Sequence, residues 1–157
     1  IGDHSERRVF KTARIEKILV SAAKQSLKGA VPVVNEPVSV KEFIKNCHVV
    51  GTSHNGYEDF APRNDIESRD SDTIAPLKLI AYCFEDESVP RRSIKEVLDG
   101  FNGTDVIVMI GPEGDFSQEE AVLALEAGFI PVHLGASRPR TETAAVTAAS
   151  AAYFRYM

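Results

Sequence analysis

The chain has 157 residues, 43% of them hydrophobic, and a formal net charge of −5. These values predict one soluble globular domain and exclude a surface that is basic throughout, as a protein that coats nucleic acid would need. The sequence holds no uncharged apolar stretch of about 18 residues and no secretory signal pattern, so we expect a cytoplasmic protein without membrane contact.

The two cysteines and four histidines show no spacing typical of a metal site. Cys47 and Cys83 lie far apart, and we expect buried thiols rather than a disulfide. His133 lies in a predicted strand and is expected to be a core residue rather than a catalytic base. The sequence therefore predicts no bound metal.

Basic side chains gather in the first 30 residues, whereas the rest of the chain is acidic. This distribution is typical either of a polyanion contact at one edge or of a solvated helix face, and both interpretations stay open. Within the same segment, apolar residues at helical spacing predict a helix over residues 12–28, which Gly29 would end.

The next predicted elements alternate between helices and strands. Three helix starts share a serine followed three residues later by a glutamate, at Ser39, Ser93 and Ser117. Short apolar runs predict strands at residues 48–51, 77–84, 105–110 and 129–134. This alternation predicts an α/β fold, with a parallel sheet covered by helices on both faces.

Two further segments complete the organisation of the chain. Residues 53–76 are polar, contain Pro and Gly and lack a period, which predicts a long surface loop. The last predicted helix, over residues 142–156, is crowded with alanine. Small side chains let another backbone approach closely, so we expect this helix to pack inside the fold or against a second subunit.

The stretch MIGPEGDFSQEE, residues 109–120, places a glycine-rich turn directly after a predicted strand. Gly111 and Gly114 allow backbone angles and close approaches that a Cβ would forbid, and Pro112 stiffens the turn. Open α/β sheets bind ligands at the carboxyl ends of their strands. The pattern predicts either a ligand-binding loop or a tight turn without a ligand, and the absence of Lys and Arg argues against a bare phosphate.

The stretch LGASRPRTETAA, residues 134–145, repeats this arrangement after the next predicted strand. Its loop contributes Arg138 and Arg140, the cations that the first loop lacks. Two such loops can converge on one crevice, although exposed arginines also serve solubility alone.

The two stretches, separated by AGFIPVH, together resemble the paired signatures of the bacterial 16S ribosomal RNA uridine-N3 methyltransferases, members of the SPOUT class with the RsmE-type domain. A looser match covers residues 5–7, 22–26 and 31–32. The resemblance implies that residues 1–157 form a SPOUT α/β domain whose residues 77–157 hold the cofactor within a deep trefoil knot, a rare topology. The family's N-terminal RNA-binding domain and first strand and helix precede the matched residues, so we expect an N-terminally truncated domain.

The resemblance also implies S-adenosylmethionine as cofactor and a homodimer with the active site at the subunit boundary. Three loops would hold the cofactor, through Leu79, Ile80, Ala81, Tyr82, Ile110, Gly111, Pro112, Glu113, Gly114, Leu134, Gly135, Ser137, Arg138, Pro139, Arg140, Thr141 and Ala144. The sequence departs from the family at Asp115, where Gly is usual, and at Pro139, where Leu is usual. Pro139 lacks a backbone N–H, which would weaken cofactor binding if that donor were used.

The implied reaction is methylation of N3 of a uridine in 16S ribosomal RNA of the small subunit. The uridine must lose its N3 proton, and negative charge then spreads over O2 and O4. Arg140 is the candidate that stabilises this charge, Glu142 is the candidate that accepts the proton or orients Arg140, and Glu113 is second. Both glutamates are equally consistent with helix-start electrostatics.

The candidate RNA contacts are basic residues of the first segment, Arg7, Arg8, Lys11 and Arg14. Without the family's RNA-binding domain, we expect this chain to bind RNA weakly and to methylate it poorly. Two alternatives remain open: a non-catalytic knotted nucleotide- or RNA-binding module, and an α/β enzyme that acts on anionic metabolites through Arg138 and Arg140.

Overall fold

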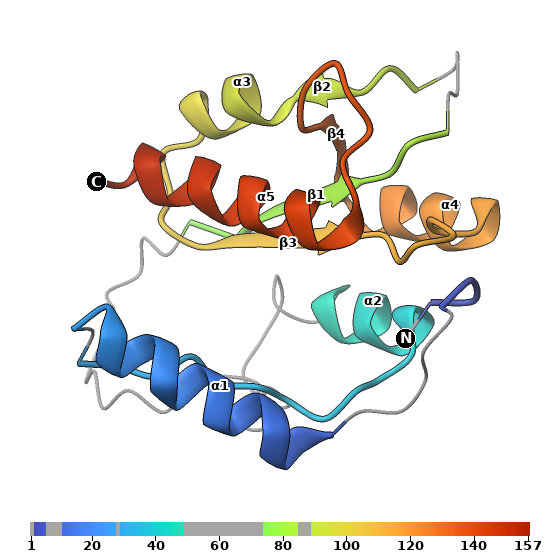
Figure 1. Ribbon diagram of the computed structural model, residues 1–157. Helices are drawn as coiled ribbons and strands as arrows, with labels where there is room; N and C mark the ends of the chain where they lie inside the picture. Colours follow the sequence, from blue (N-terminus) through green and yellow to red (C-terminus); the bar gives the residue numbers. More distant parts are fainter. Residues whose placement is uncertain (1, 6–10, 28, 49–73, 85–88) are drawn as a thin grey trace.

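The computed structural model describes residues 2–5, 11–27, 29–48, 74–84 and 89–157. In chain order the elements are α1 (Thr12–Gln25), α2 (Val40–His48), β1 (Leu77–Ala81), β2 (Arg92–Ser93), α3 (Ile94–Asp99), β3 (Val106–Ile110), α4 (Gln118–Glu126), β4 (Ile130–His133) and α5 (Thr141–Arg155) (Figure 1). Strands and helices alternate from β2 onward, as the sequence predicted, whereas β2 itself, which follows β1 directly, was not predicted.

The four strands form one sheet in the order β2-β4-β1-β3, and all three neighbouring pairs are parallel. β1 is central: Leu79 lies opposite Val108 of β3 on one side and Ile130 of β4 on the other. Because parallel strands point the same way, the carboxyl ends of β1, β3 and β4 meet at one edge of the sheet.

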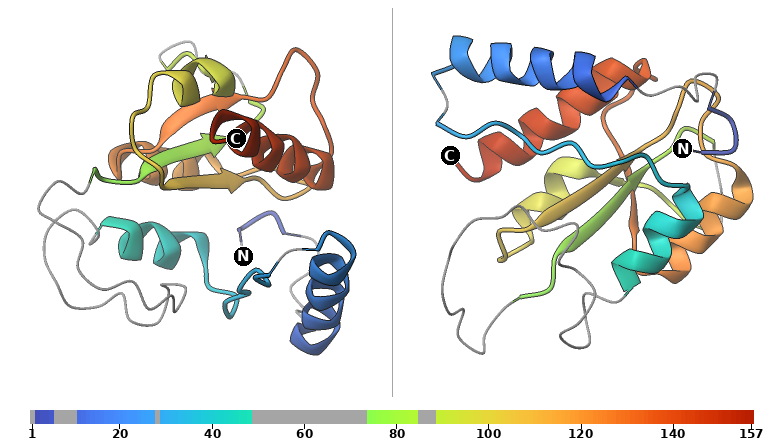
Figure 2. Two further views of the ribbon diagram at one scale, coloured as in Figure 1. Left: turned by 90° about the vertical axis from the view of Figure 1, so that its left-hand side faces the viewer. Right: turned by 90° about the horizontal axis from the view of Figure 1, so that it is seen from below.

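Both faces of the sheet are covered by helices (Figure 2). Successive side chains of a strand point to opposite faces, so the fully buried Leu79 and Ile80 enter different cores. Leu79 packs with Leu98 of α3 and Ala148 of α5, whereas Ile80 packs with residues of α2 and α4. The prediction of an α/β fold with a parallel sheet between two helical layers is confirmed.

Helix α1 lies apart from the sheet (Figure 1). Only Ala23 of this helix is buried, and Ile18 on its apolar side is 55% exposed. The helix ends at Gln25, before the predicted end at residue 28, because Leu27 adopts a left-handed φ of 55° that is incompatible with a continuing right-handed helix. Its amphipathic sequence therefore forms a helix, but its apolar side meets few partners in the described part of the chain.

The three predicted helix starts differ in their capping. Ser117 forms the complete capping box with Glu120, and Ser39 accepts a hydrogen bond from the Glu42 backbone N–H at 3.1 Å. Ser93 precedes α3, so the predicted helix start is confirmed. Its side chain makes no capping hydrogen bond, so the predicted capping is wrong. Ser93 instead ends β2, where it pairs with His133.

Two strand predictions need correction. His48 is the last residue of α2 rather than the start of a strand, because Ile44 and Cys47 bury one helical face against the sheet, and residues 49–51 lie outside the described residues. β1 ends at Ala81, short of the predicted residue 84. Of the predicted loop at 53–76 only residues 74–76 are described, and they form no helix or strand.

Cys47 and Cys83 are not joined by a disulfide, and Cys47 is buried as expected, whereas Cys83 is partly exposed, contrary to the expectation of a buried thiol. Cys83 is accessible because it follows β1 at the open edge of the sheet. Among the described helices, none combines the length and apolar character needed to cross a membrane.

Candidate active site

A cavity of about 1040 Å³ opens at the carboxyl ends of β1, β3 and β4. Its walls come from residues 81–83 after β1, from the segment after β3, from residues 132–144 around the start of α5, and from residues 89–91 before β2. Small-molecule sites typically enclose about 300–1,000 Å³, so the cavity is at the upper end of that range. The two loops that the sequence singled out therefore line the same cavity.

The loop after β3 is shaped by close packing around Gly111. A Cβ on Gly111 would lie 2.7 Å from Asp115 Oδ1, which leaves room for hydrogen alone. The Asp115 N–H donates to the Pro112 carbonyl at 2.9 Å and closes the turn, and Asp115 has a left-handed φ of 65°. Since Ser117 then caps α4, both ends of the loop are fixed.

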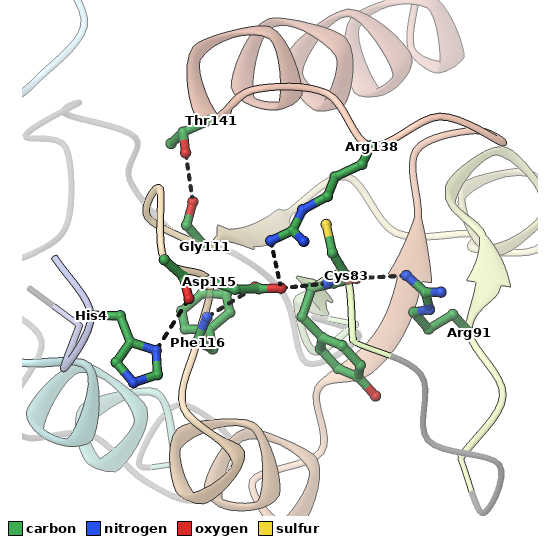
Figure 3. Close-up of polar contacts among 10 residues, drawn as sticks. His4, Cys83, Arg91, Gly111, Asp115, Phe116, Arg138 and Thr141 are labelled. Atoms are coloured by element: carbon green, nitrogen blue, oxygen red, sulfur yellow. Dashed lines mark hydrogen bonds and ion pairs between the residues drawn. The ribbon is translucent and has the colours of Figure 1, made fainter. Parts of the chain in front are cut away.

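The buried carboxylate of Asp115 connects this loop to its neighbours (Figure 3). Its Oδ2 accepts the Cys83 N–H at 2.7 Å, and its Oδ1 accepts the Phe116 N–H at 2.9 Å. Arg138 Nη2 approaches Oδ2 at 3.8 Å from the loop before α5. The Asp115 side chain thus contacts three of the segments that line the cavity.

The loop between β4 and α5 bends at Gly135, whose φ of 139° favours glycine. At its far end the Thr141 hydroxyl donates to the Gly111 carbonyl at 3.1 Å, which joins the start of α5 to the loop after β3 (Figure 3). Arg140 is the N-cap residue of α5, and its exposed side chain makes no hydrogen bond or ion pair with any described residue. Its guanidinium is available to a ligand.

Arg91 lines the cavity from the segment before β2. Its Nη1 donates to the Tyr82 carbonyl at 2.8 Å, immediately after β1. Tyr82 itself is buried and stacks on Phe84 with ring centroids 4.3 Å apart. Sequence reasoning missed Arg91 because no local pattern connects it to β1.

Most residues predicted to contact the cofactor lie around the cavity: Ala81, Tyr82, Ile110, Gly111, Pro112, Glu113, Leu134, Gly135, Ser137, Arg138, Pro139, Arg140, Thr141 and Ala144. Leu79 and Ile80 do not line it, because they point into the two cores below. Gly114 does not line it either, because it faces His4.

The three catalytic candidates Arg140, Glu142 and Glu113 all line the cavity and are exposed. Of the RNA-contact candidates, Lys11 and Arg14 are exposed at the start of α1 and do not line the cavity. Arg7 and Arg8 lie outside the described residues. The structure thus groups the catalytic candidates together and places the described RNA candidates elsewhere.

Several lining residues were not identified from the sequence: Cys83, Val89, Pro90, Arg91, Val132, His133 and Ala136. His133 was expected to be a core residue, but it is half-buried at the end of β4 and lines the cavity. Its Nδ1 is buried without a hydrogen-bond partner among the described residues. A strand-end position was the signal that could have identified it.

Residues 2–5 support the outer side of the loop after β3. His4 Nδ1 lies 3.1 Å from the Gly114 carbonyl oxygen, and the Asp3 N–H donates to Glu120 Oε1 at 2.9 Å. Glu120 is only 1% exposed and also accepts the Ser117 N–H at 3.0 Å. The loop is therefore held between the cavity loops on one side and the start of the chain on the other.

No group of three or more potential metal ligands was found among the described residues. The cavity contains backbone turns, guanidinium groups and carboxylates, which suit an organic ligand with both polar and charged parts.

Comparison with known proteins identifies the family to which this architecture corresponds. The model of the RNA methyltransferase domain family matches residues 1–153. Ribosomal RNA small subunit methyltransferase E of Mesomycoplasma hyopneumoniae (strain 232) is 26% identical over 136 residues, which make up 87% of this chain and 45% of that protein.

Solved structures agree with this match. A probable rRNA-methyltransferase from Porphyromonas gingivalis is 36% identical with a TM-score of 0.66, over 99% of this chain and 53% of that chain. Ribosomal RNA small subunit methyltransferase E from Neisseria gonorrhoeae, solved bound to S-adenosyl methionine, is 25% identical with a TM-score of 0.57, over 96% of this chain and 52% of that chain. The chain spans about half the length of these relatives. It belongs to the RNA methyltransferase domain family.

Proposed function

We propose that this chain is the catalytic part of an S-adenosylmethionine-dependent methyltransferase that modifies N3 of a uridine in 16S ribosomal RNA. One observation carries the proposal: the two glycine-containing loops at 110–115 and 134–141 line a single cavity at the carboxyl ends of β1, β3 and β4. The similarity to a methyltransferase structure bound to S-adenosyl methionine supports the choice of cofactor.

The cavity residues fit this cofactor. Gly111 and Gly135 shape the backbone turns of the two loops that line the cavity, and a Cβ at Gly111 would collide with Asp115. When bound, S-adenosylmethionine supplies an electrophilic methyl group. The loops at 81–83, 110–113 and 134–141, together with Ala144, would bind and orient it and exclude water from the reacting atoms.

The topology of the cofactor part belongs to the proposal. We infer that residues 77–157 form a deep trefoil knot within a SPOUT domain that extends over residues 1–157. The non-sequential strand order β2-β4-β1-β3 supports this inference, together with the resemblance of the two loops to the family's signatures.

Arg140 is the proposed stabiliser of the uridine anion. Its guanidinium lines the cavity and has no partner among the described residues, so its charge is not already neutralised by the protein. A cation placed where negative charge develops lowers the barrier, because the charge is stabilised without reorganisation. Glu142, in the first turn of α5, is the proposed proton acceptor or partner of Arg140, with Glu113 as the second candidate.

A homodimer with the active site at the subunit boundary completes the proposal. Helix α5 supports it, because side chains on its outer side and at its end remain exposed: Val146 at 66%, Tyr153 at 53%, Phe154 at 69% and Met157 at 84%. Such apolar surface is typical of an interface. The small subunit ribosomal RNA would approach through Lys11 and Arg14, with Arg7 and Arg8 in the same segment.

The test is methyl transfer from labelled S-adenosylmethionine to 16S ribosomal RNA by the full-length protein, with the modified base identified by mass spectrometry. Arg140→Ala should lower transfer by about 100-fold or more, a much larger change than in the Kd for S-adenosylhomocysteine, because the arginine acts mainly on the developing charge. Arg140→Lys is the control that retains a positive charge. Unchanged turnover in Arg140→Ala would remove Arg140 from the mechanism, and cofactor binding without transfer to any RNA would instead support the non-catalytic module.

A further inference from the structure

We propose that Asp115 is a positioning residue whose carboxylate holds three cavity loops in the arrangement that binds the cofactor. This inference rests on the proposed function, because it assigns Asp115 a role in the same cavity. It adds to that function a single side chain, Asp115, that connects the separate loops of the site.

The contacts of Asp115 reach all three loops (Figure 3). Oδ2 accepts the Cys83 N–H at 2.7 Å, which fixes the backbone immediately after β1. Oδ1 accepts the Phe116 N–H at 2.9 Å within the loop after β3. Arg138 Nη2 lies 3.8 Å from Oδ2 and belongs to the loop before α5. Movement of this carboxylate would release three segments that line the cavity.

The burial of these groups ranks their contributions. The Asp115 side chain is only 11% exposed, so its hydrogen bonds to the Cys83 and Phe116 amides are charge-assisted and poorly accessible to water. The Arg138 side chain is 65% exposed, and an exposed ion pair at this separation contributes little. The bond to Cys83 therefore carries most of the positioning, and Arg138 adds a weaker connection.

The backbone at position 115 does not by itself favour an aspartate. Asp115 has a φ of 65°, a conformation that glycine adopts without strain and that Asp and Asn tolerate better than other side chains. A glycine would satisfy this backbone but could not bind Cys83, Phe116 or Arg138. An aspartate at this position has an unfavourable backbone conformation and a buried charge. The hydrogen bonds from the Cys83 and Phe116 N–H groups offset these two costs.

The same geometry separates the roles of the two arginines in the Arg138-Pro139-Arg140 stretch. Arg138 faces the Asp115 carboxylate, so part of its charge is already balanced within the loops. Arg140 has no such partner among the described residues. Arg138 therefore acts with Asp115 on the arrangement of the loops, whereas Arg140 faces the ligand.

Calorimetric titration with S-adenosylhomocysteine tests this inference on wild type, Asp115→Asn, Asp115→Gly, Arg138→Met and the double variant Asp115→Asn with Arg138→Met. Asp115→Asn tolerates the left-handed backbone but keeps only one acceptor oxygen, so it removes the charge together with one of the two hydrogen bonds to backbone N–H groups. We expect Asp115→Gly to raise Kd by about tenfold or more and Asp115→Asn by about threefold to tenfold. Arg138→Met should raise it about twofold, and the double variant should bind as Asp115→Asn does, because the two residues act as a unit.

Asp99→Asn is the matched control, because Asp99 also pairs with a cation, Lys95, but lies outside the cavity. Its Kd should stay within about twofold of wild type. Amide hydrogen exchange of the ligand-free proteins supplies a second readout, in which the Cys83 amide should exchange faster in Asp115→Gly and Asp115→Asn but not in Asp99→Asn.

The outcomes separate this inference from the function on which it rests. If wild type does not bind S-adenosylhomocysteine, the proposed function fails and the positioning role fails with it. If wild type binds and both folded Asp115 variants bind equally well, the positioning role alone is wrong. A variant that lowers the melting temperature without changing Kd would also overturn it, because that is the result of a purely structural role. Should Asp115→Gly fail to fold, Asp115→Asn decides.

Discussion

β1 and α1 are both clear from their sequences, yet they differ sharply in what surrounds them. β1 is central in the sheet, and its Leu79 and Ile80 are fully buried in the cores on the two faces. α1 buries only Ala23, and Ile18 on its apolar side is 55% exposed. A clear local sequence pattern is therefore enough to predict a helix or strand. How much that element contributes to the free energy of unfolding depends on the residues that pack against it.

The proposed function is located in the well-packed region. The cavity begins where β1, β3 and β4 end, so its loops start from strands that are fixed on both sides by parallel pairing. α1 contributes exposed basic side chains and no wall of this cavity. The proposed function thus assigns rigid positioning of the cofactor to the sheet and its loops, and electrostatic attraction to RNA to α1.

The largest expected effect comes from the core under the cavity. Leu79→Ala removes a fully buried side chain of β1 that packs with residues of β4, α3 and α5, and should lower the free energy of unfolding by about 2–5 kcal/mol. Urea denaturation measures the change. A loss below about 1 kcal/mol would mean that this core relaxes around the cavity left by the leucine and that the contrast with α1 is overstated.

Gly111→Ala tests the packing of the loop that follows β3. Its Cβ would lie 2.7 Å from Asp115 Oδ1 and 3.3 Å from Asp115 Cα, so the loop must shift. We expect a loss of about 1–3 kcal/mol in the free energy of unfolding, together with weaker binding of S-adenosylhomocysteine. Unchanged stability and affinity would show that the loop is not held as closely as its contacts indicate.

Ser117→Ala should have a smaller effect, a loss of about 1 kcal/mol, because it removes the side chain that accepts the Glu120 N–H at the start of α4. Ser93→Ala is the matched control, since Ser93 precedes α3 without a capping hydrogen bond. Thermal or urea unfolding of the two variants should rank Ser117→Ala as the more destabilised. Equal losses would contradict the distinction between the two helix starts.

Ile18→Ala in α1 should have the smallest effect, a change within about 0.5 kcal/mol, because most of this side chain is already in contact with solvent. The comparison with Leu79→Ala sharpens the contrast between the two regions. A loss above about 2 kcal/mol for Ile18→Ala would show that α1 is covered in solution, for instance by a second copy of the chain.

The features predicted correctly from the sequence are those that depend on residues close together in the chain. The Ser117 capping box, the turn at Gly111 and the strands before both cavity loops each depend on neighbours within a few residues, and all are present. His48 was misassigned because a short apolar run fits a strand and the end of a helix equally well.

Long-range features could not be predicted from local patterns. Arg91 reaches the Tyr82 carbonyl across the end of β1, and the two-residue strand β2 exists only because β4 lies beside it. The carboxylate of Asp115 looked like a departure from a family pattern, and its contacts to Cys83 and Arg138 became visible only in the folded chain. Spacing along the sequence carries no information on such contacts.

The most direct test of the central claim is calorimetric titration of this 157-residue chain with S-adenosylhomocysteine, the product of methyl transfer. Saturable binding of one molecule per chain is the predicted result, because the three loops that would bind it already line one cavity. If the chain is shown to be folded and does not bind S-adenosylhomocysteine, the assignment of this cavity as the cofactor site is contradicted.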